Sequence, residues 1–556
     1  MNRPLKIVAI VIGVLLVIVI AVPFFIDANA FRPRLESELT DTLGRPSKVG
    51  NLSLSLFSGG VTADNISIAD DPAFSQTPFI QAKSLKVGVE LIPLIFSKSL
   101  NITDLTLNQP EISLVHSREG DKWNFSSLGN TGTAQAQAKT GTTAAGTATR
   151  PSGSANSTPP PSSGSANSTS TSGSASSTPN LSIGKLKVSN GRVTVSRAGS
   201  SQQPRIYDKV DIEVSNFSFT SSFPFQMTAS LPAGGSLKLE GTAGPIDASN
   251  AAHTPLQAKV SIKQMNLAAS GFIDPAAGIS GIADFEGSLV SDGHEVKTSG
   301  TLKGEKLQVV KKGAPAGKPL QVQYTVVHDL VKETGTLSQG EVTMGKAVAH
   351  LTGTYDAHGT TTIVNLKMEG QGLPVDDVEA MLPAVGVILP SGSQLKGGTL
   401  AVNLVTTGPV DKSVTTGTVR LENSALAGFN LGSKLSAISA LSGKGATAQK
   451  DTTIQNFSAN VRVAPEGTRA DNISLIVPTL GTASGAGTVS PSNALDFKMK
   501  ADNIPFLIQG TTSDPKFLPD VKGMAGGMMQ NALTGNKLGQ KNPLSGVTGM
   551  FKKKPN

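Results

Sequence analysis

Apolar and polar residues alternate in many short runs along most of this chain. Val87 and Val89 belong to one run, and Leu400, Val402 and Leu404 to another. Because successive side chains of a strand point to opposite faces, a period of two predicts strands with one buried face. Gly, Asn, Asp and Pro separate the runs, as turn residues do. The chain is therefore expected to be mainly β.

Helical patterns are few. Asn29 is placed to cap a short leading helix in which leucines repeat at every fourth position, and Gly44 is placed to end it. Residues 374–382 and 432–441 show two further helical patterns. Parallel strands need long crossover connections, so few helices predict antiparallel pairing. The expected fold is an N-terminal transmembrane helix followed by a long, twisted antiparallel β-sheet that forms an elongated groove.

The N-terminus carries an apolar run from Leu5 to Ile26, interrupted by Lys6. A run of roughly 20 residues is long enough to span a bilayer and longer than the core of a signal peptide. The membrane-facing positions of this anchor are Leu5, Ile7, Val11, Leu15, Val19, Val22, Phe25 and Ile26. The alternative is a cleaved signal peptide, because residues 28–30 form a small-residue cleavage site. In either case the large domain is expected outside the cytoplasm.

Composition divides the chain into five parts. Residues 130–179 consist mainly of Gly, Ser, Thr, Ala and Pro. Such a segment cannot bury enough apolar area to offset its ordering entropy, which predicts a disordered linker. The expected parts are an anchor over 1–28, a β region with a short leading helix over 29–129, the linker over 130–179, a long β-groove region over 180–520, and a Gly/Met/Lys-rich tail over 521–556. The tail is either a disordered terminus or a short amphipathic segment that touches lipid.

No catalytic pattern stands out. The chain has no cysteine, and its six histidines lack the spacing of a metal site. A nucleophile elbow and a phosphate-binding loop are both missing from the sequence. Basic residues are dispersed, and one Trp and three Tyr supply few stacking platforms, so nucleic acid is not an expected partner. We expect neither enzymatic activity nor a cofactor, and no metal.

The predicted strands present more apolar surface than so few helices could cover. A sheet with one apolar face packs it against another sheet, curls around it, or leaves a groove that accepts apolar ligands. The candidate groove face consists of Leu52, Leu54, Leu56, Val87, Val89, Leu400, Val402, Leu404, Phe497 and Met499.

Both ends of the chain carry motifs of a known family. Four N-terminal stretches, 26–33, 43–46, 49–52 and 69–74, resemble the opening of AsmA-family proteins, and three later stretches, 397–400, 428–432 and 510–517, resemble that family's C-terminal region. The motif positions are Asp27, Asn29, Phe31, Arg32, Pro33, Gly44, Arg45, Gly50, Asp70, Pro72, Phe74, Gly510, Pro515 and Phe517.

The resemblance implies a single-pass inner-membrane protein of diderm bacteria whose large domain lies in the periplasm. It also implies kinship with TamB and the chorein-type bridge-like lipid transfer proteins, whose β-groove carries phospholipid acyl chains. The implied partners are membrane phospholipids, the inner membrane itself, and an outer-membrane or envelope protein. The expected function is outer-membrane biogenesis through lipid handling. The alternative is a non-transporting structural or regulatory factor for outer-membrane protein assembly, in which the apolar faces are simply core.

Overall fold

A computed structural model describes most of the chain outside its termini and the predicted linker. The described residues are 28–55, 60–90, 102–117, 122–128, 182–199, 203–247, 253–270, 278–358, 361–436, 450–478, 481–501 and 504–524. They hold 25 strands and a few short helices, which confirms the mainly β prediction. The chain divides into two compact units: unit 1 is Met1–Ala229 with Ala243–Ala251, and unit 2 is Ser230–Thr242 with Ala252–Asn556.

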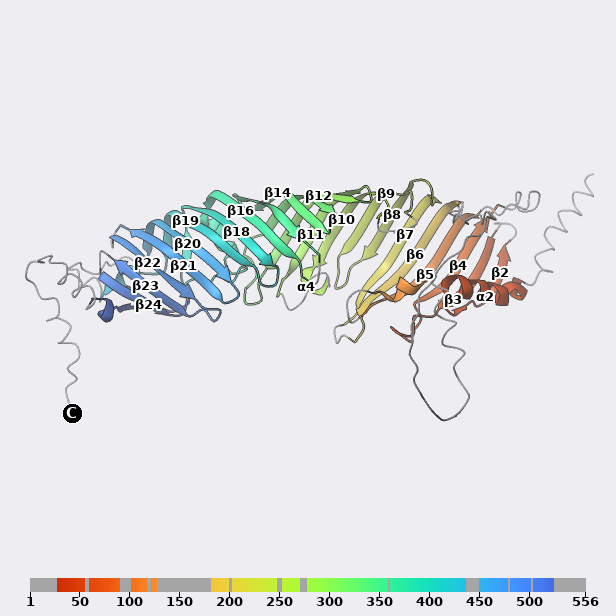
Figure 1. Cartoon of the computed structure of the whole chain (residues 1–556), viewed down its shortest axis with the longest axis horizontal. Coiled ribbons are helices and arrows are strands. Elements are labelled where there is room, and N and C mark those ends of the chain that lie inside the picture. Colours follow the sequence, from red (N-terminus) through yellow and green to blue (C-terminus); the bar gives the residue numbers. More distant parts are fainter. Residues whose placement is uncertain are drawn as a thin grey trace, which may run out of the picture. The chain divides into compact units, whose positions relative to one another are not determined.

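Unit 1, drawn from red to yellow in Figure 1, begins with the turn η1 (Ala28–Phe31) and the helix α2 (Arg32–Leu43). Its strands are β1 (Ser47–Lys48), β2 (Leu52–Ser55), β3 (Gly60–Ile68), β4 (Ile80–Val89), β5 (Ile102–His116), β6 (Ser182–Arg197), β7 (Arg205–Ser218) and β8 (Phe223–Ser230), with the turn η2 (Asn124–Ser127) after β5.

The pairing in unit 1 corrects the prediction of an antiparallel sheet. β1, β2 and β4 pair antiparallel with β3, and β4 with β5, but β5 and β6 are parallel. A parallel pair needs a long connection that returns the chain to the same end of the sheet. The low-complexity segment between His116 and Ser182 supplies that length, and its own residues, 130–179, lie outside the described part.

The leading helix agrees with the sequence in its end and its face but not in its start. Gly44 follows α2 with φ +66°, a left-handed conformation that favours glycine. Leu35 and Leu39 pack against a buried cluster under β2 and β3. Asn29 is not the N-cap that we expected. It lies in η1, and its Oδ1 accepts a 2.9 Å hydrogen bond from the backbone N–H of Leu52, which ties the helix start to β2.

Unit 2, drawn from yellow-green to blue in Figure 1, carries 17 strands in its described residues. They are β9 (Ser236–Ala243), β10 (Leu256–Asn266), β11 (Ser280–Ser291), β12 (Glu295–Gln308), β13 (Leu320–Asp329), β14 (Thr334–Met344), β15 (Ala347–Asp356), β16 (Ile363–Pro374), β17 (Gln394–Lys396), β18 (Thr399–Pro409), β19 (Val414–Ala427), β20 (Thr452–Ala464), β21 (Gly467–Val477), β22 (Gly481–Val489), β23 (Leu495–Ala501), β24 (Ile504–Gly510) and β25 (Pro515–Pro519). Its helices are α4 (Leu267–Ser270), α5 (Val375–Val378) with the turn η5 (Glu379–Met381), and α6 (Leu431–Lys434).

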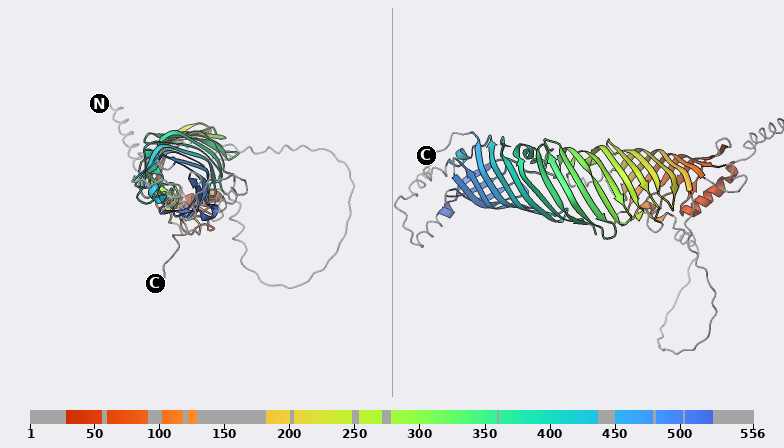
Figure 2. Two further views of the ribbon diagram at one scale, coloured as in Figure 1. Left: turned by 90° about the vertical axis from the view of Figure 1, so that its left-hand side faces the viewer. Right: turned by 90° about the horizontal axis from the view of Figure 1, so that it is seen from above.

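The strands of unit 2 pair antiparallel in nearly unbroken chain order. β9 pairs with β10, and each strand from β10 to β16 pairs with the next; β16 then pairs with β18, and the series continues to β25. Register shifts recur, for example around Gln264 and Asn472, both with positive φ. Such bulges increase strand twist, and Figure 2 shows the strands of this unit curving around a common axis.

The two ends of the strands in unit 2 differ. β10, β16 and β19 end where α4, α5 and α6 begin, and we call this the helical end. The opposite end, here called the hairpin end, is formed mostly by short turns. The helical pattern over 374–382 is thereby confirmed as α5 and η5. The pattern over 432–441 is confirmed only in its first residues, because 437–449 lie outside the described part.

The predicted anchor also lies outside the described residues, since the structure describes the chain from Ala28 onward. Among the helices that are described, none combines the length and apolarity needed to cross a membrane.

Candidate functional site

The register of unit 2 collects the alternating apolar residues into continuous rows on one face of the sheet. Residues that oppose each other across paired strands point to the same face. One row is Leu351, Met368, Leu404, Gly417, Val461, Ala470, Gly487, Phe497, Ile508 and Phe517, and a second is Leu373, Leu400, Leu421, Phe457, Leu475, Ala483 and Ala501. We call this surface the apolar face.

The opposite surface is polar, and we call it the polar face. The residues adjacent to the first row form a row of their own, Glu369, Asn403, Thr418, Asn460 and Asp471. Ion pairs such as Lys367 to Glu369, with Nζ and Oε1 2.8 Å apart, lie at its surface. The sheet of unit 2 is therefore amphipathic across its thickness.

The helical end of the apolar face is filled by core. Val375 of α5 packs with Leu421 and Ile454, and α4 packs with Ala283 and Leu307. A third cluster joins α6 to β20–β25, and its buried members are Phe429, Leu431, Leu435, Ala459, Ile473, Val477, Met499 and Phe506. Each short helix thus closes part of the face at this end.

Farther from the helical end, the apolar face of β12–β19 is only half-buried. Val402, Leu404 and Val419 retain intermediate exposure, as do Val322 and Leu366. Their neighbours on the polar face are mostly exposed. These aliphatic side chains form a surface that is neither closed core nor fully solvated.

Glycines reduce the side-chain bulk on the apolar face. A Cβ added at Gly487 would collide with the ring of Phe497, and one added at Gly300 would lie 3.2 Å from a ring carbon of Phe285. Phe285 and Tyr324 stack with ring centroids 6.0 Å apart. Because glycine carries no side chain, large neighbouring side chains can lie across it. The aromatic rings can thus lie flat along the sheet, over the glycine positions, instead of projecting from it.

The structure divides the candidate groove residues between these environments. Val402 and Leu404 lie on the half-buried stretch, and Leu400 packs beside the α5 cluster. Met499 is a core residue with 5% exposure, and Phe497 packs against the same cluster.

The unit 1 candidates divide in a similar way. Leu52 is buried under α2, whereas Val87 and Val89 are half-buried farther along the same face of the sheet. Val87 of β4 lies opposite Val61 of β3 on one side and Leu105 of β5 on the other. The side chain of Leu54 and all of Leu56 lie outside the described part. As lipid-contacting positions, all ten remain predictions.

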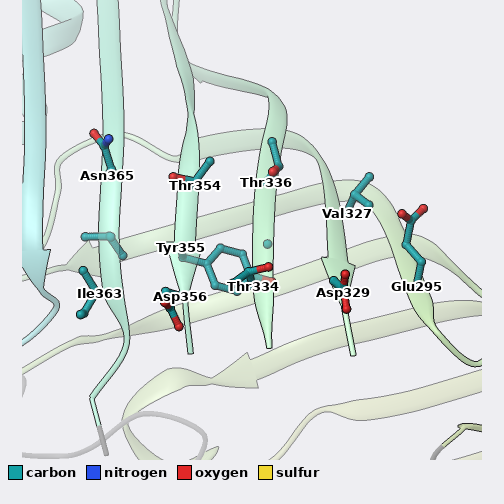
Figure 3. A pocket seen from close by; sticks show the side chains of 12 residues that line it. Glu295, Val327, Asp329, Thr334, Thr336, Thr354, Tyr355, Asp356, Ile363 and Asn365 are labelled. Atoms are coloured by element: carbon teal, nitrogen blue, oxygen red, sulfur yellow. The ribbon is translucent and has the colours of Figure 1, made fainter. Parts of the chain in front are cut away.

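A pocket of about 430 Å³ lies near the hairpin end of β12–β16. Its lining, shown in Figure 3, includes Thr334, Thr336, Thr354 and Asn365, which share the polar face. These four residues lie on the face opposite the apolar rows, whereas Tyr355 and Val364 of the same lining belong to the apolar face, so the pocket has a mixed lining.

Two carboxylates of that pocket, Asp329 and Asp356, accept hydrogen bonds from neighbouring basic residues. Lys332 hydrogen-bonds Asp329, Nζ to Oδ2 2.8 Å, and lowers the pKa of Asp329 to about 2. The backbone N–H and the ring of His358 lower the pKa of Asp356, with Nδ1 2.9 Å from Oδ1. Asp329 and Asp356 therefore remain ionised at neutral pH.

Histidines that look dispersed in the sequence gather at the hairpin end. His253 and His294 have ring centroids 6.2 Å apart, and His328 stacks on Tyr355 with its Nδ1 3.1 Å from the Tyr355 hydroxyl. Sequence reasoning missed this grouping because it depends on which hairpins become neighbours. Within the described residues, no group of three or more His, Asp or Glu side chains is placed to hold a metal ion.

A buried polar network ties unit 1 together. Arg45 donates from Nη2 to Asn124 O at 2.9 Å and to Ser127 Oγ at 2.6 Å, and its Nη1 lies 3.5 Å from Asp70 Oδ1. Asn124 donates from Nδ2 to Asp70 and accepts from the backbone N–H of Val115 at 3.0 Å. Arg45, Asp70 and Asn124 are all buried. Three chain segments distant in sequence are thus joined by charge-assisted hydrogen bonds.

Comparison with protein families matches residues 1–308 to the AsmA family, which is more than half of the chain. This chain belongs to the AsmA family. No curated protein and no solved structure matches it in the other two comparisons. AsmA-family proteins are cell-envelope proteins, and the family is generally non-enzymatic.

Several of the AsmA motif positions have a local structural role. Pro33 lies in the first turn of α2, where its missing N–H costs nothing, and Arg32 pairs with Glu36 at 3.3 Å. A Cβ at Gly50 would lie 2.7 Å from the backbone oxygen of Asp64, so the close approach of these two segments requires glycine. Phe31 is exposed.

The remaining motif positions lie in loops or beyond the matched range. Pro72 and Phe74 belong to the loop that follows Asp70, and Asp27 lies outside the described residues. Gly510, Pro515 and Phe517 lie after residue 308, so their assignment to the family's C-terminal region stays a prediction.

Proposed function

We propose that this AsmA-family protein takes part in outer-membrane biogenesis by holding or transferring phospholipid acyl chains on the apolar face of unit 2. It would do so as an inner-membrane-anchored protein whose large domain lies in the periplasm. Membership of an envelope family supports the setting. The observation that carries the proposal is the half-buried stretch of the apolar face over β12–β19, where no helix among the described residues closes the rows of aliphatic side chains.

The free energy of burying apolar surface favours acyl chains as ligands of this face. Each buried CH₂ contributes about 0.8 kcal/mol, so a chain lying along several rows gains enough to bind without a specific headgroup contact. Binding of this kind would discriminate little between headgroups.

The test compares lipid co-purification between two double variants of the full chain, measured by native mass spectrometry and by lipid extraction. Val402→Asp with Leu404→Asp places two carboxylates on the apolar face. The control, Thr416→Asp with Thr418→Asp, places two on exposed positions of the polar face of the adjacent strand. We expect the first variant to lose most of its phospholipid and the control to retain it.

The alternative, a non-transporting factor for outer-membrane protein assembly, has one observation in its favour. Over β20–β25 the apolar face is filled by its own core around α6, so part of the face needs no ligand. A folded wild-type protein that carries no phospholipid, or equal lipid in both variants at matched thermal stability, would sink the lipid proposal in favour of this one.

A further inference from the structure

A loop at the helical end of unit 2 exposes aliphatic side chains to solvent. The segment Pro383–Pro390, here called the apolar loop, follows η5 and contains no charged residue. Val385, Val387 and Ile388 are 42%, 45% and 43% exposed. Three neighbouring branched side chains that remain this exposed are unusual for a loop, since loop tips are commonly polar.

A second segment, which carries two lysines, is hydrogen-bonded to the apolar loop. The turn 309–314, after β12, donates from Val309 N to Ala384 O at 3.0 Å and from Ala314 N to Pro383 O at 2.8 Å. Lys311 and Lys312 lie between these two bonds and are both exposed. The turn that carries both lysines is therefore bonded directly to the first two residues of the apolar loop.

The apolar loop lies where the helical end of the sheet contacts the hairpin end of later strands. Ser391, just after the loop, donates from its backbone N–H to Ser513 O at 2.8 Å, in the turn between β24 and β25. Lys312 donates from Nζ to Pro491 O at 3.0 Å, in the turn between β22 and β23. Segments of the helical end thus contact turns of the hairpin end, which places the loop at a boundary of the apolar face.

We propose that the apolar loop inserts into the surface of a bilayer that carries anionic headgroups, with Lys311 and Lys312 at headgroup level. Aliphatic residues flanked by lysines are the chemistry of an interfacial membrane contact. Protein-binding hot spots are instead enriched in Trp, Tyr and Arg, and neither the turn nor the loop contains any of these. The proposal rests on the proposed function, because a membrane contact here would bring acyl chains to the edge of the apolar face.

The experiment uses the absence of cysteine, which makes any introduced cysteine a unique labelling site. Full-length protein carrying Val387→Cys is labelled with the fluorophore NBD and held in nanodiscs free of quencher. Vesicles of phosphatidylethanolamine and phosphatidylglycerol that contain a doxyl-quencher lipid are then added. Val331→Cys, labelled identically, is the matched control, since Val331 is a 65% exposed valine in a hairpin-end turn.

We expect the label at 387 to shift to the blue and to be quenched by these vesicles, while the label at 331 changes little. Lys311→Gln should weaken the vesicle affinity about fivefold, and vesicles of phosphatidylcholine alone should bind more weakly. No change at 387, or an equal change at 331, would overturn the proposal, and a protein partner would then be the better occupant.

The two proposals fail separately. If the wild-type chain co-purifies with phospholipid but the label at 387 does not respond, the membrane contact alone is wrong. If the label responds but phospholipid is absent from the protein, or is equally retained after Val402→Asp with Leu404→Asp, the lipid-holding function is wrong and the contact stands.

Discussion

At the scale of single residues, AsmA motif positions in unit 1 serve the architecture of the fold. Arg45 and Asp70 are buried, and together with Asn124 they join the end of α2, the β3–β4 loop and η2 through hydrogen bonds. A buried charge is tolerated only when it is paired and hydrogen-bonded, as this one is. A motif can therefore identify a family without marking its functional surface.

Arg45→Ala is expected to destabilise unit 1 by about 3 kcal/mol, because it leaves the buried Asp70 carboxylate without its cation. Arg34→Ala removes one half of an exposed pair with Glu38 and should cost less than about 1 kcal/mol. Hydrogen exchange at the Val115 amide, which donates to Asn124, reports on the network directly. Equal protection in both variants would show that the network contributes little.

Asp71 makes unit 1 sensitive to acid. Burial raises its pKa, but hydrogen bonds from the Ala73 N–H and the Ser127 hydroxyl, together with the charge of Arg45, outweigh this and lower the pKa below 3.8. A carboxyl whose pKa is lowered by folding stabilises the native state above its unfolded pKa, and this stabilisation is lost as the pH falls through the folded value.

Trp123, the single tryptophan, precedes Asn124 and stacks on Phe125, so its fluorescence monitors this region. Acidification below pH 3.8 should lower the unfolding temperature seen by Trp123. Asp71→Asn should be less stable than wild type at neutral pH and should lose less stability on acidification. An identical acid dependence in both proteins would exclude Asp71 as the cause.

At the scale of elements, the parallel pair β5–β6 interrupts an otherwise antiparallel series. The alternation in each strand identified both strands, but alternation has no direction. Whether two strands run parallel depends on the length of chain between them, and here the low-complexity segment makes the parallel arrangement possible.

Deleting residues 141–170 is expected to leave the β5–β6 pair intact. Loop closure entropy changes by only about 0.6 kcal/mol for each halving of the loop, and the shortened loop would still be long enough for a crossover. Thermal unfolding followed by Trp123 fluorescence should therefore match wild type closely. A large loss of stability would mean that the segment contributes contacts of its own.

At the scale of the whole molecule, the proposed function depends on an extended surface that many strands build together. Among the described residues of unit 2, the surface that could serve an apolar ligand is a set of rows built from many strands, each contributing one or two side chains. Single conservative substitutions on such a surface should change lipid binding little. This is why the test in β18 introduces two carboxylates at once.

The sequence by itself determined that the chain is mainly β, that its strands have one apolar face, that the leading helix ends at Gly44, and that short helices begin near residues 375 and 431. These follow from local periodicity and turn chemistry, which need no knowledge of distant residues. Family membership was likewise visible in the motif positions before residue 308.

Only the tertiary structure decided which apolar residues are core and which are half-buried. Val402 and Met499 have equivalent alternation in sequence, but Met499 packs with Phe506 under α6, whereas Val402 has no helix above it among the described residues. It also decided the parallel pair, the Arg45 network and the position of the apolar loop beside Lys311. Each of these depends on contacts between segments far apart along the chain, and residue periodicity carries no information about such contacts.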